Sequence, residues 1–192
     1  MSFRHSILGG TGTRTWSIAL ATHLKTDLVN ETTEPALALS GNRERAETRY
    51  RSRYRERKPP TAGYNCFGHV FALRRTALYD FDLAVLETIL AEDGYGEVKD
   101  ESIEVDDAVI YLDEKKEPFH AGRVIKLEPL LIGTNSSLVA VVLSKLDDVS
   151  GEYEHKIDEE IWPGMVASRR VFRARQQAPR PGHWRGVLAA LP

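Results

Sequence analysis

The chain has 192 residues, of which 42% are hydrophobic and 28% are charged, and its net charge is −2. This composition predicts a folded domain with extensions, and the small net charge gives no general attraction to nucleic acid. A single cysteine excludes an internal disulfide, and no apolar run approaches the roughly 18–20 residues that cross a membrane. Because the N-terminal sequence is a poor secretion signal, we expect a cytoplasmic protein.

Charge divides the chain into three parts. Residues 42–60 hold eight Lys and Arg residues against three Glu, and this segment ends at Pro59–Pro60, a natural boundary. The residues after Ser168 carry six Arg and no acid. We therefore predict a weakly structured N-terminal arm over 1–60, a compact domain over 61–165 and an Arg-rich tail over 166–192.

The middle part changes its hydrophobic period along the chain. A short helix is predicted to begin at Cys66, and residues 81–95 place Leu83, Leu86, Ile89 and Leu90 on one helical stripe. Runs rich in Val, Ile and Leu then predict strands over 106–112, 118–127 and 136–146. The turn DEKKEP joins the first two strands and predicts an antiparallel hairpin. Helices followed by a small antiparallel sheet indicate an α+β fold.

Cys66 lies at the expected helix start, in the stretch YNCFGHVFA. Asn65 is a good N-cap residue, which places Cys66 in the first turn. Unpaired N–H groups and the helix dipole stabilise a thiolate there, and the backbone N–H of Cys66 could help to hold an oxyanion. The alternative is a small buried hydrophobic residue.

A nucleophilic cysteine needs a base, and His120 is the leading candidate. It lies within an otherwise apolar strand, and the small residues Ala121 and Gly122 follow it, leaving room for another group to approach. The alternative is a core histidine with a satisfied hydrogen bond. Cysteine at a helix start together with histidine on a sheet strand is the more specific pattern.

Four ordered blocks over roughly residues 61–165 resemble the NlpC-type and CHAP-type branch of the papain-like cysteine peptidases and amidases. The blocks are NC-G-FA from Asn65, DDAVIY over 106–111, H-G-V from His120, and SK followed by E-H at Ser144–Lys145 and Glu152–His155. The resemblance implies a permuted papain-like fold, in which a helix bearing the cysteine packs on an antiparallel sheet bearing the histidine. It also implies that Cys66 is the nucleophile and His120 the base of an amide-hydrolysing enzyme.

A third residue normally orients such a histidine. The order of the family blocks points to Ser144, with Glu152 and His155 as alternatives. Lys145 is unsuitable for this role, because an ammonium would oppose formation of the imidazolium ion, and its side chain should face away from that of Ser144.

Other motifs carry weaker signals. His69 lies on the same helix face as Cys66 but not across a cleft from it. The segment GGTGTRT (9–15) lacks the complete pattern of a nucleotide-binding loop. The ligand spacing of a zinc site is also missing from the cysteine and histidines, so no metal or other cofactor is expected.

These observations favour a cysteine-dependent hydrolase, a peptidase or amidase, that cleaves a peptide or peptidoglycan-like amide through a Cys66–His120 dyad or a triad. The rival is a non-catalytic binding or toxin-associated module of the same fold, which would contact an acidic partner or polyanion through its Arg-rich arms. The sequence contains no specific nucleic-acid motif.

Overall fold

The computed structural model describes residues 29–31, 44, 48–79, 81–132, 135–148, 150–159 and 161–175. The segment GGTGTRT lies outside the described residues.

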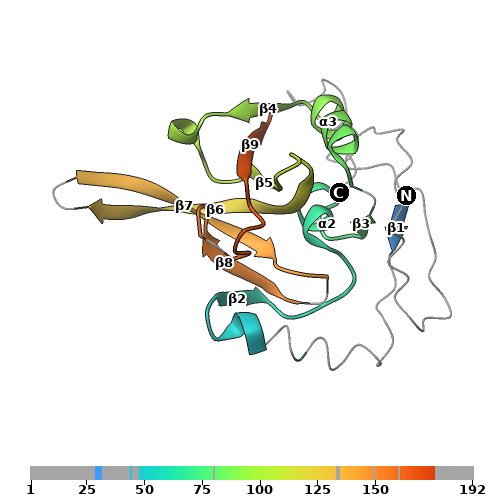
Figure 1. Ribbon diagram of the computed structural model, residues 1–192, viewed down its shortest axis with the longest axis horizontal. Coiled ribbons are helices and arrows are strands. Elements are labelled where there is room, and N and C mark those ends of the chain that lie inside the picture. Colours follow the sequence, from blue (N-terminus) through green and yellow to red (C-terminus); the bar gives the residue numbers. More distant parts are fainter. Residues whose placement is uncertain are drawn as a thin grey trace, which may run out of the picture.

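Seven strands form one sheet in which every neighbouring pair is antiparallel (Figure 1). Their spatial order is β2 (Arg55–Lys58), β8 (Glu152–Lys156), β7 (Asn135–Lys145), β6 (Pro118–Ile132), β5 (Ala108–Leu112), β9 (Ser168–Ala174) and β4 (Tyr95–Val98). The other elements include β1 (Val29–Glu31), which pairs with β3 (Ala77–Tyr79), the helices α2 (Cys66–Phe71) and α3 (Leu83–Glu92), and the 3₁₀ turn η2 (Asp100–Ser102). Residues 48–51 are helical as well. The α+β class with a mostly antiparallel sheet is therefore confirmed.

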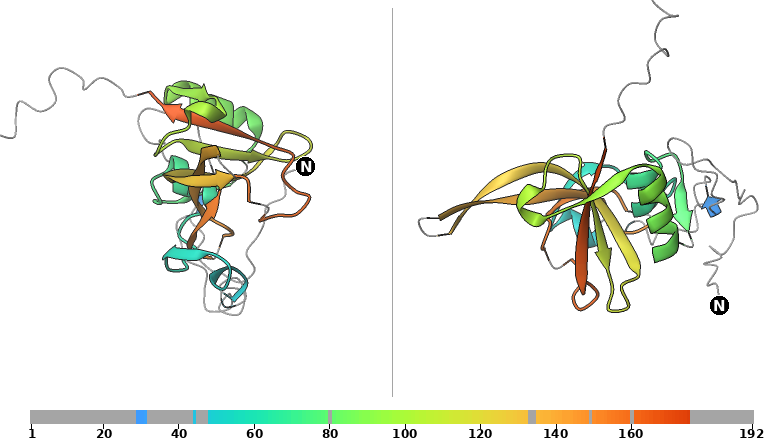
Figure 2. Two further views of the ribbon diagram at one scale, coloured as in Figure 1. Left: turned by 90° about the vertical axis from the view of Figure 1, so that its left-hand side faces the viewer. Right: turned by 90° about the horizontal axis from the view of Figure 1, so that it is seen from above.

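The predicted hairpin forms between β5 and β6, with Ile110 opposite Ala121. Strands β6 and β7 then continue together well beyond the rest of the sheet, as Figures 1 and 2 show. Helices α2 and α3 lie at the opposite end of the molecule from this projecting hairpin.

Alternation along the strands gives the sheet two distinct apolar faces. One face carries Ile110 and Ala121 and packs against the helices; we call it the helix face. The other carries Tyr111, Val124 and Val142 in a separate cluster, and we call it the far face. Any site built on this sheet therefore depends on which face each strand residue occupies.

The sheet extends past both predicted domain boundaries, which corrects the predicted division. Strand β2 lies within the predicted arm and pairs with β8, and the nearby Tyr50 and Tyr54 are buried against Tyr153. Strand β9 lies within the predicted tail and pairs with both β5 and β4.

Strand β9 was not predicted, because its arginines make the segment look like a solvated tail. Its Arg169, Arg170 and Arg173 pair with acidic residues on neighbouring segments, while Val171 and Phe172 are buried in the middle of the strand. An Arg-rich segment of this kind is a core strand with charged edges, and composition alone does not separate it from a solvated tail.

Candidate functional site

Helix α2 begins at Cys66, as predicted, and Asn65 is its N-cap. The Asn65 side-chain oxygen accepts hydrogen bonds from the backbone N–H groups of Gly68 (2.9 Å) and Leu78 (3.1 Å). The Asn65 Nδ2 donates to the Leu78 carbonyl at 2.6 Å. One amide side chain thus caps the helix and fixes its start to β3, which sets the position of the cysteine.

Cys66 is the one residue of α2 that is not classed as buried. Its sulfur is nevertheless enclosed, and this burial raises the pKa of the thiol to about 12. The negative charge of Asp148 raises this pKa further, whereas backbone hydrogen bonding from Ala121 and Phe67 lowers it and favours the thiolate. At neutral pH the resting thiol is therefore protonated, and a nearby group must take its proton before it can attack.

His120 does not meet Cys66 in this structure. Its ring lies 5.7 Å from the Tyr111 ring and 4.1 Å from the Trp162 ring, measured between centroids, so it projects from the far face. Cys66 packs against the helix face. Within the described residues no hydrogen bond joins the two side chains, and the buried His120 Nε2 has no partner. The predicted dyad is thus absent, because strand alternation directs Ala121, and not His120, towards α2.

Ser144 and His155 come together on the far face. The Ser144 hydroxyl and the His155 Nε2 are 2.9 Å apart, and His155 Nδ1 lies 2.9 Å from the Lys156 carbonyl. Gly122 lies against this pair, since a Cβ atom there would be 2.2 Å from the Ser144 oxygen. These two candidates for the third position accompany His120, but neither hydrogen-bonds to it.

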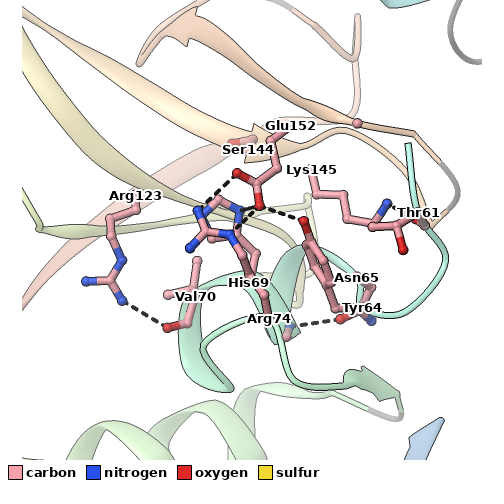
Figure 3. A network of polar contacts seen from close by, with 12 residues as sticks. Thr61, Tyr64, Asn65, His69, Val70, Arg74, Arg123, Ser144, Lys145 and Glu152 are labelled. Atoms are coloured by element: carbon pink, nitrogen blue, oxygen red, sulfur yellow. Dashed lines mark hydrogen bonds and ion pairs between the residues drawn. The ribbon is translucent and has the colours of Figure 1, made fainter. Parts of the chain in front are cut away.

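Glu152 projects instead from the helix face, where it is completely buried within a polar network (Figure 3). It accepts hydrogen bonds from the Tyr64 hydroxyl at 2.7 Å and from two nitrogens of Arg74. His69 Nδ1 lies 3.7 Å from the same carboxylate. Burial raises the pKa of Glu152, but the Arg74 hydrogen bonds and the other neighbours outweigh it, so the net pKa is lowered.

Arg74 reaches Glu152 from an unusual backbone. Leu73 and Arg74 have φ values of 50° and 64°, in the left-handed region that side-chain-bearing residues seldom adopt. The ion pair with a buried carboxylate supports this conformation. Sequence reasoning missed Arg74 because no spacing signal connects it with a residue on β8.

Lys145 is completely buried on the helix face, beside the start of α2. Its Nζ donates hydrogen bonds to the carbonyls of Thr61 and Ser150, and it lies 5.3 Å from the centroid of the Tyr64 ring. Burial lowers the pKa of Lys145 to about 8. The sequence pattern correctly placed Lys145 and Ser144 on opposite faces, but it gave Lys145 no role.

No group of three or more His, Cys, Asp or Glu residues in the described part of the chain is arranged to hold a metal ion. The described helices include none that is long and apolar enough to cross a membrane. Comparisons of the chain with protein-family models, with curated proteins and with solved structures each found no match.

Proposed function

We propose that the protein is a cysteine-dependent hydrolase that cleaves an amide bond, with Cys66 as its nucleophile. The observation that carries this proposal is the position of Cys66 at the first residue of the Asn65-capped helix, where the residue is partly exposed although its sulfur is enclosed. Backbone hydrogen bonds from Ala121 and Phe67 favour negative charge on its sulfur.

The proposed reaction has two stages. The Cys66 thiol loses its proton, and the sulfur attacks the carbonyl carbon of the substrate. The C–N bond breaks, the amine leaves with a proton, and the acyl group remains on the sulfur as a thioester. Water then cleaves the thioester and restores the thiol. Backbone N–H groups around the sulfur are suitable donors for the oxyanion of each tetrahedral intermediate.

Within the α+β class, the proposal includes a permuted papain-like fold. What supports it is the cysteine-bearing helix α2 packed on the antiparallel strands β6 and β7. His120 as the base is not carried into the proposal, because its ring lies on the far face. The proposed substrate is a peptide or a peptidoglycan-like amide.

The rival binding module receives less support. Within the described part of the first Arg-rich run, Arg51, Arg53 and Arg57 form ion pairs with Glu56, Glu159 and Glu154. Each pair reduces the positive charge available to a polyanion. An acidic partner would therefore meet a surface that is already partly neutralised.

Two experiments on the full chain test the proposal. The first identifies which members of an electrophilic peptide library label the protein. The second measures turnover of amide substrates that have the same peptide sequences. We expect labelling at Cys66 and a fall in turnover of at least about a thousandfold in Cys66→Ser. Lys156 is exposed, so Lys156→Met is the control and should turn over substrate at the rate of the original chain. If Cys66→Ser turns over substrate at the original rate, the hydrolase proposal is wrong.

A further inference from the structure

The pairing of β6 with β7 places Lys145 beside Ala121, the residue whose backbone contacts Cys66. Gly122 is paired with Ser144, so extending this register by one residue places Ala121 opposite Lys145. The Cβ atoms of directly opposed residues are about 4.5–5.5 Å apart. Ala121 is also the residue whose backbone hydrogen-bonds to the Cys66 sulfur. The Lys145 side chain therefore starts from the β7 position opposite Ala121, on the helix face against which Cys66 packs.

The rest of the Lys145 side chain stays near the start of α2. Its nitrogen lies over the ring of Tyr64, two residues before Cys66. Figure 3 shows Lys145, Tyr64 and Asn65 grouped together beside Glu152. A thiolate at Cys66 would raise the pKa of Lys145, although less than Asp147, Asp148 and Glu152 do.

The hydrogen bonds of Lys145 leave one position on its nitrogen open. The carbonyls of Thr61 and Ser150 take two N–H groups, and no acceptor among the described residues takes a third. A charged lysine has three N–H donors. A neutral lysine has two N–H donors and one lone pair, so it satisfies the same two carbonyls while its lone pair can accept a proton. The site thus accommodates Lys145 in either state.

Burial and the neighbouring charges together determine the pKa of Lys145. Burial lowers its pKa, whereas Asp147 and Asp148 in the β7–β8 turn, Glu152 on β8 and Cys66 on α2 raise it, and the result is about 8. A base is most effective when its pKa lies near the working pH, and lysines reach this range by burial. His69, His120 and His155 all have lowered pKa values because of burial, and His120 and His155 lie on the other face.

We propose that Lys145 is the base that accepts the proton of Cys66, so that a Cys–Lys pair, and not a Cys–His pair, forms the nucleophile. This inference rests on the proposed function. In the forward step the Cys66 S–H bond breaks and the neutral Lys145 amine takes the proton, giving a thiolate and an ammonium ion. The ammonium ion returns that proton to the leaving amine as the substrate C–N bond breaks.

Alkylation by iodoacetamide measures the thiolate directly, and Cys66 is the only cysteine in the chain. Two interacting groups titrate as a pair, so the alkylation rate of the original chain should rise with an inflection near pH 8. In Lys145→Met the profile should move to higher pH and the rate at pH 8 should fall by about tenfold or more, because loss of a nearby cation shifts a thiol pKa by about one unit or more. The Lys156→Met control should match the original chain.

Lys145→Arg separates a base from a simple positive charge. Arginine keeps the charge but cannot accept a proton at these pH values. We expect Lys145→Arg to retain rapid alkylation and to lose amide turnover by about a hundredfold. The inference is overturned if folded Lys145→Met shows the alkylation profile of the original chain. It is also overturned if His120→Ala abolishes turnover while Lys145→Met retains it.

A measurement on the unaltered chain covers the case in which the Lys145 variants fail to fold. The ratio of the rates with anionic iodoacetate and neutral iodoacetamide should exceed the ratio for N-acetylcysteine at the same pH and ionic strength, because a cation beside the sulfur attracts the anionic reagent. A ratio equal to or below that of the free thiol contradicts the pair. If the pair is found but no amide is cleaved, the proton transfer stands and the hydrolase function fails.

Discussion

Three buried histidines, His69, His120 and His155, flank the sheet, with side chains almost entirely shielded from solvent. Burial lowers the pKa of His69 and of His155 to about 4, and it lowers that of His120 well below 6.5. Each ring is therefore neutral in the folded protein over a pH range in which the unfolded chain binds a proton. The histidines thus make stability depend on pH, whether or not the protein has catalytic activity.

Stability should fall as the pH is lowered from about 6.5 towards 4. In this window the unfolded chain binds up to three more protons at these histidines, and each contributes a slope of about 1.4 kcal/mol per pH unit. Above pH 6.5 these histidines are neutral in the unfolded chain as well, so none of this stability is lost. Glu152, whose folded pKa is lowered from 4.5, adds its own loss only at more acidic pH.

His155→Gln tests this account through urea unfolding followed by tryptophan fluorescence between pH 7.5 and 4.5. Glutamine can still hydrogen-bond to Ser144 but does not titrate. We therefore expect lower stability at pH 7.5 and a pH slope reduced by about a third, since two of the three histidines remain. An unchanged slope would show that His155 binds protons equally in both states.

At the scale of elements, the contact between α2 and the segment before β3 fixes the position of Cys66. Gly68 lies so close to Thr76 that a Cβ atom would be 1.9 Å from the Thr76 carbonyl oxygen. Because backbone cannot move aside as a flexible side chain does, this close approach requires glycine within the helix. The same contact holds the cysteine-bearing end of α2 against the segment before β3.

Gly68→Ala should destabilise the protein by about 1–3 kcal/mol through overpacking. Helix propensity alone predicts the opposite sign, a gain of about 1 kcal/mol from alanine. Gly96→Ala on β4 is the matched control: the nearest atom to its Cβ is 3.9 Å away, so a change within about 0.5 kcal/mol is expected. Chemical denaturation of both variants decides between the two signs, and a stabilised Gly68→Ala would contradict the close contact.

At the scale of the whole molecule, β9 lies in the sheet between β5 and β4 and pairs with both. It contributes the buried Val171 and Phe172, and its arginines bind acidic residues on both sides. Burial of two large apolar side chains contributes about 3–6 kcal/mol, which is comparable with the total stability of a small domain, about 5–15 kcal/mol. We therefore expect the segment that looks like a charged tail to be required for folding.

A chain that ends at residue 165 should lose its cooperative thermal transition, because β4 and β5 lose their shared partner strand. A chain that ends at residue 175 keeps all of β9 and should retain a cooperative transition. Circular dichroism on the two truncations measures both outcomes. A cooperative transition in the shorter chain would show that β9 contributes little to the fold.

The sequence by itself determined the elements that depend on local pattern. These are the helix start at Asn65 and Cys66, the helix around Leu86, and the strands near β5, β6 and β7. Each has a capping residue or a hydrophobic period that can be recognised within a few residues of chain, so no distant contact is needed to predict it. The opposite orientations of Ser144 and Lys145 were predictable for the same reason.

Only the tertiary structure decided which side chains meet. Whether Ala121 or His120 faces α2 depends on strand register, and a shift of one residue exchanges the two faces. The network of Glu152 with Tyr64 and Arg74 joins residues 78 and 88 positions apart, and β9 enters the sheet next to a strand far earlier in the chain. Such contacts are set by packing and by the pairing of buried charges. A short stretch of sequence does not reveal these contacts, so only the tertiary structure shows which side chains lie near Cys66.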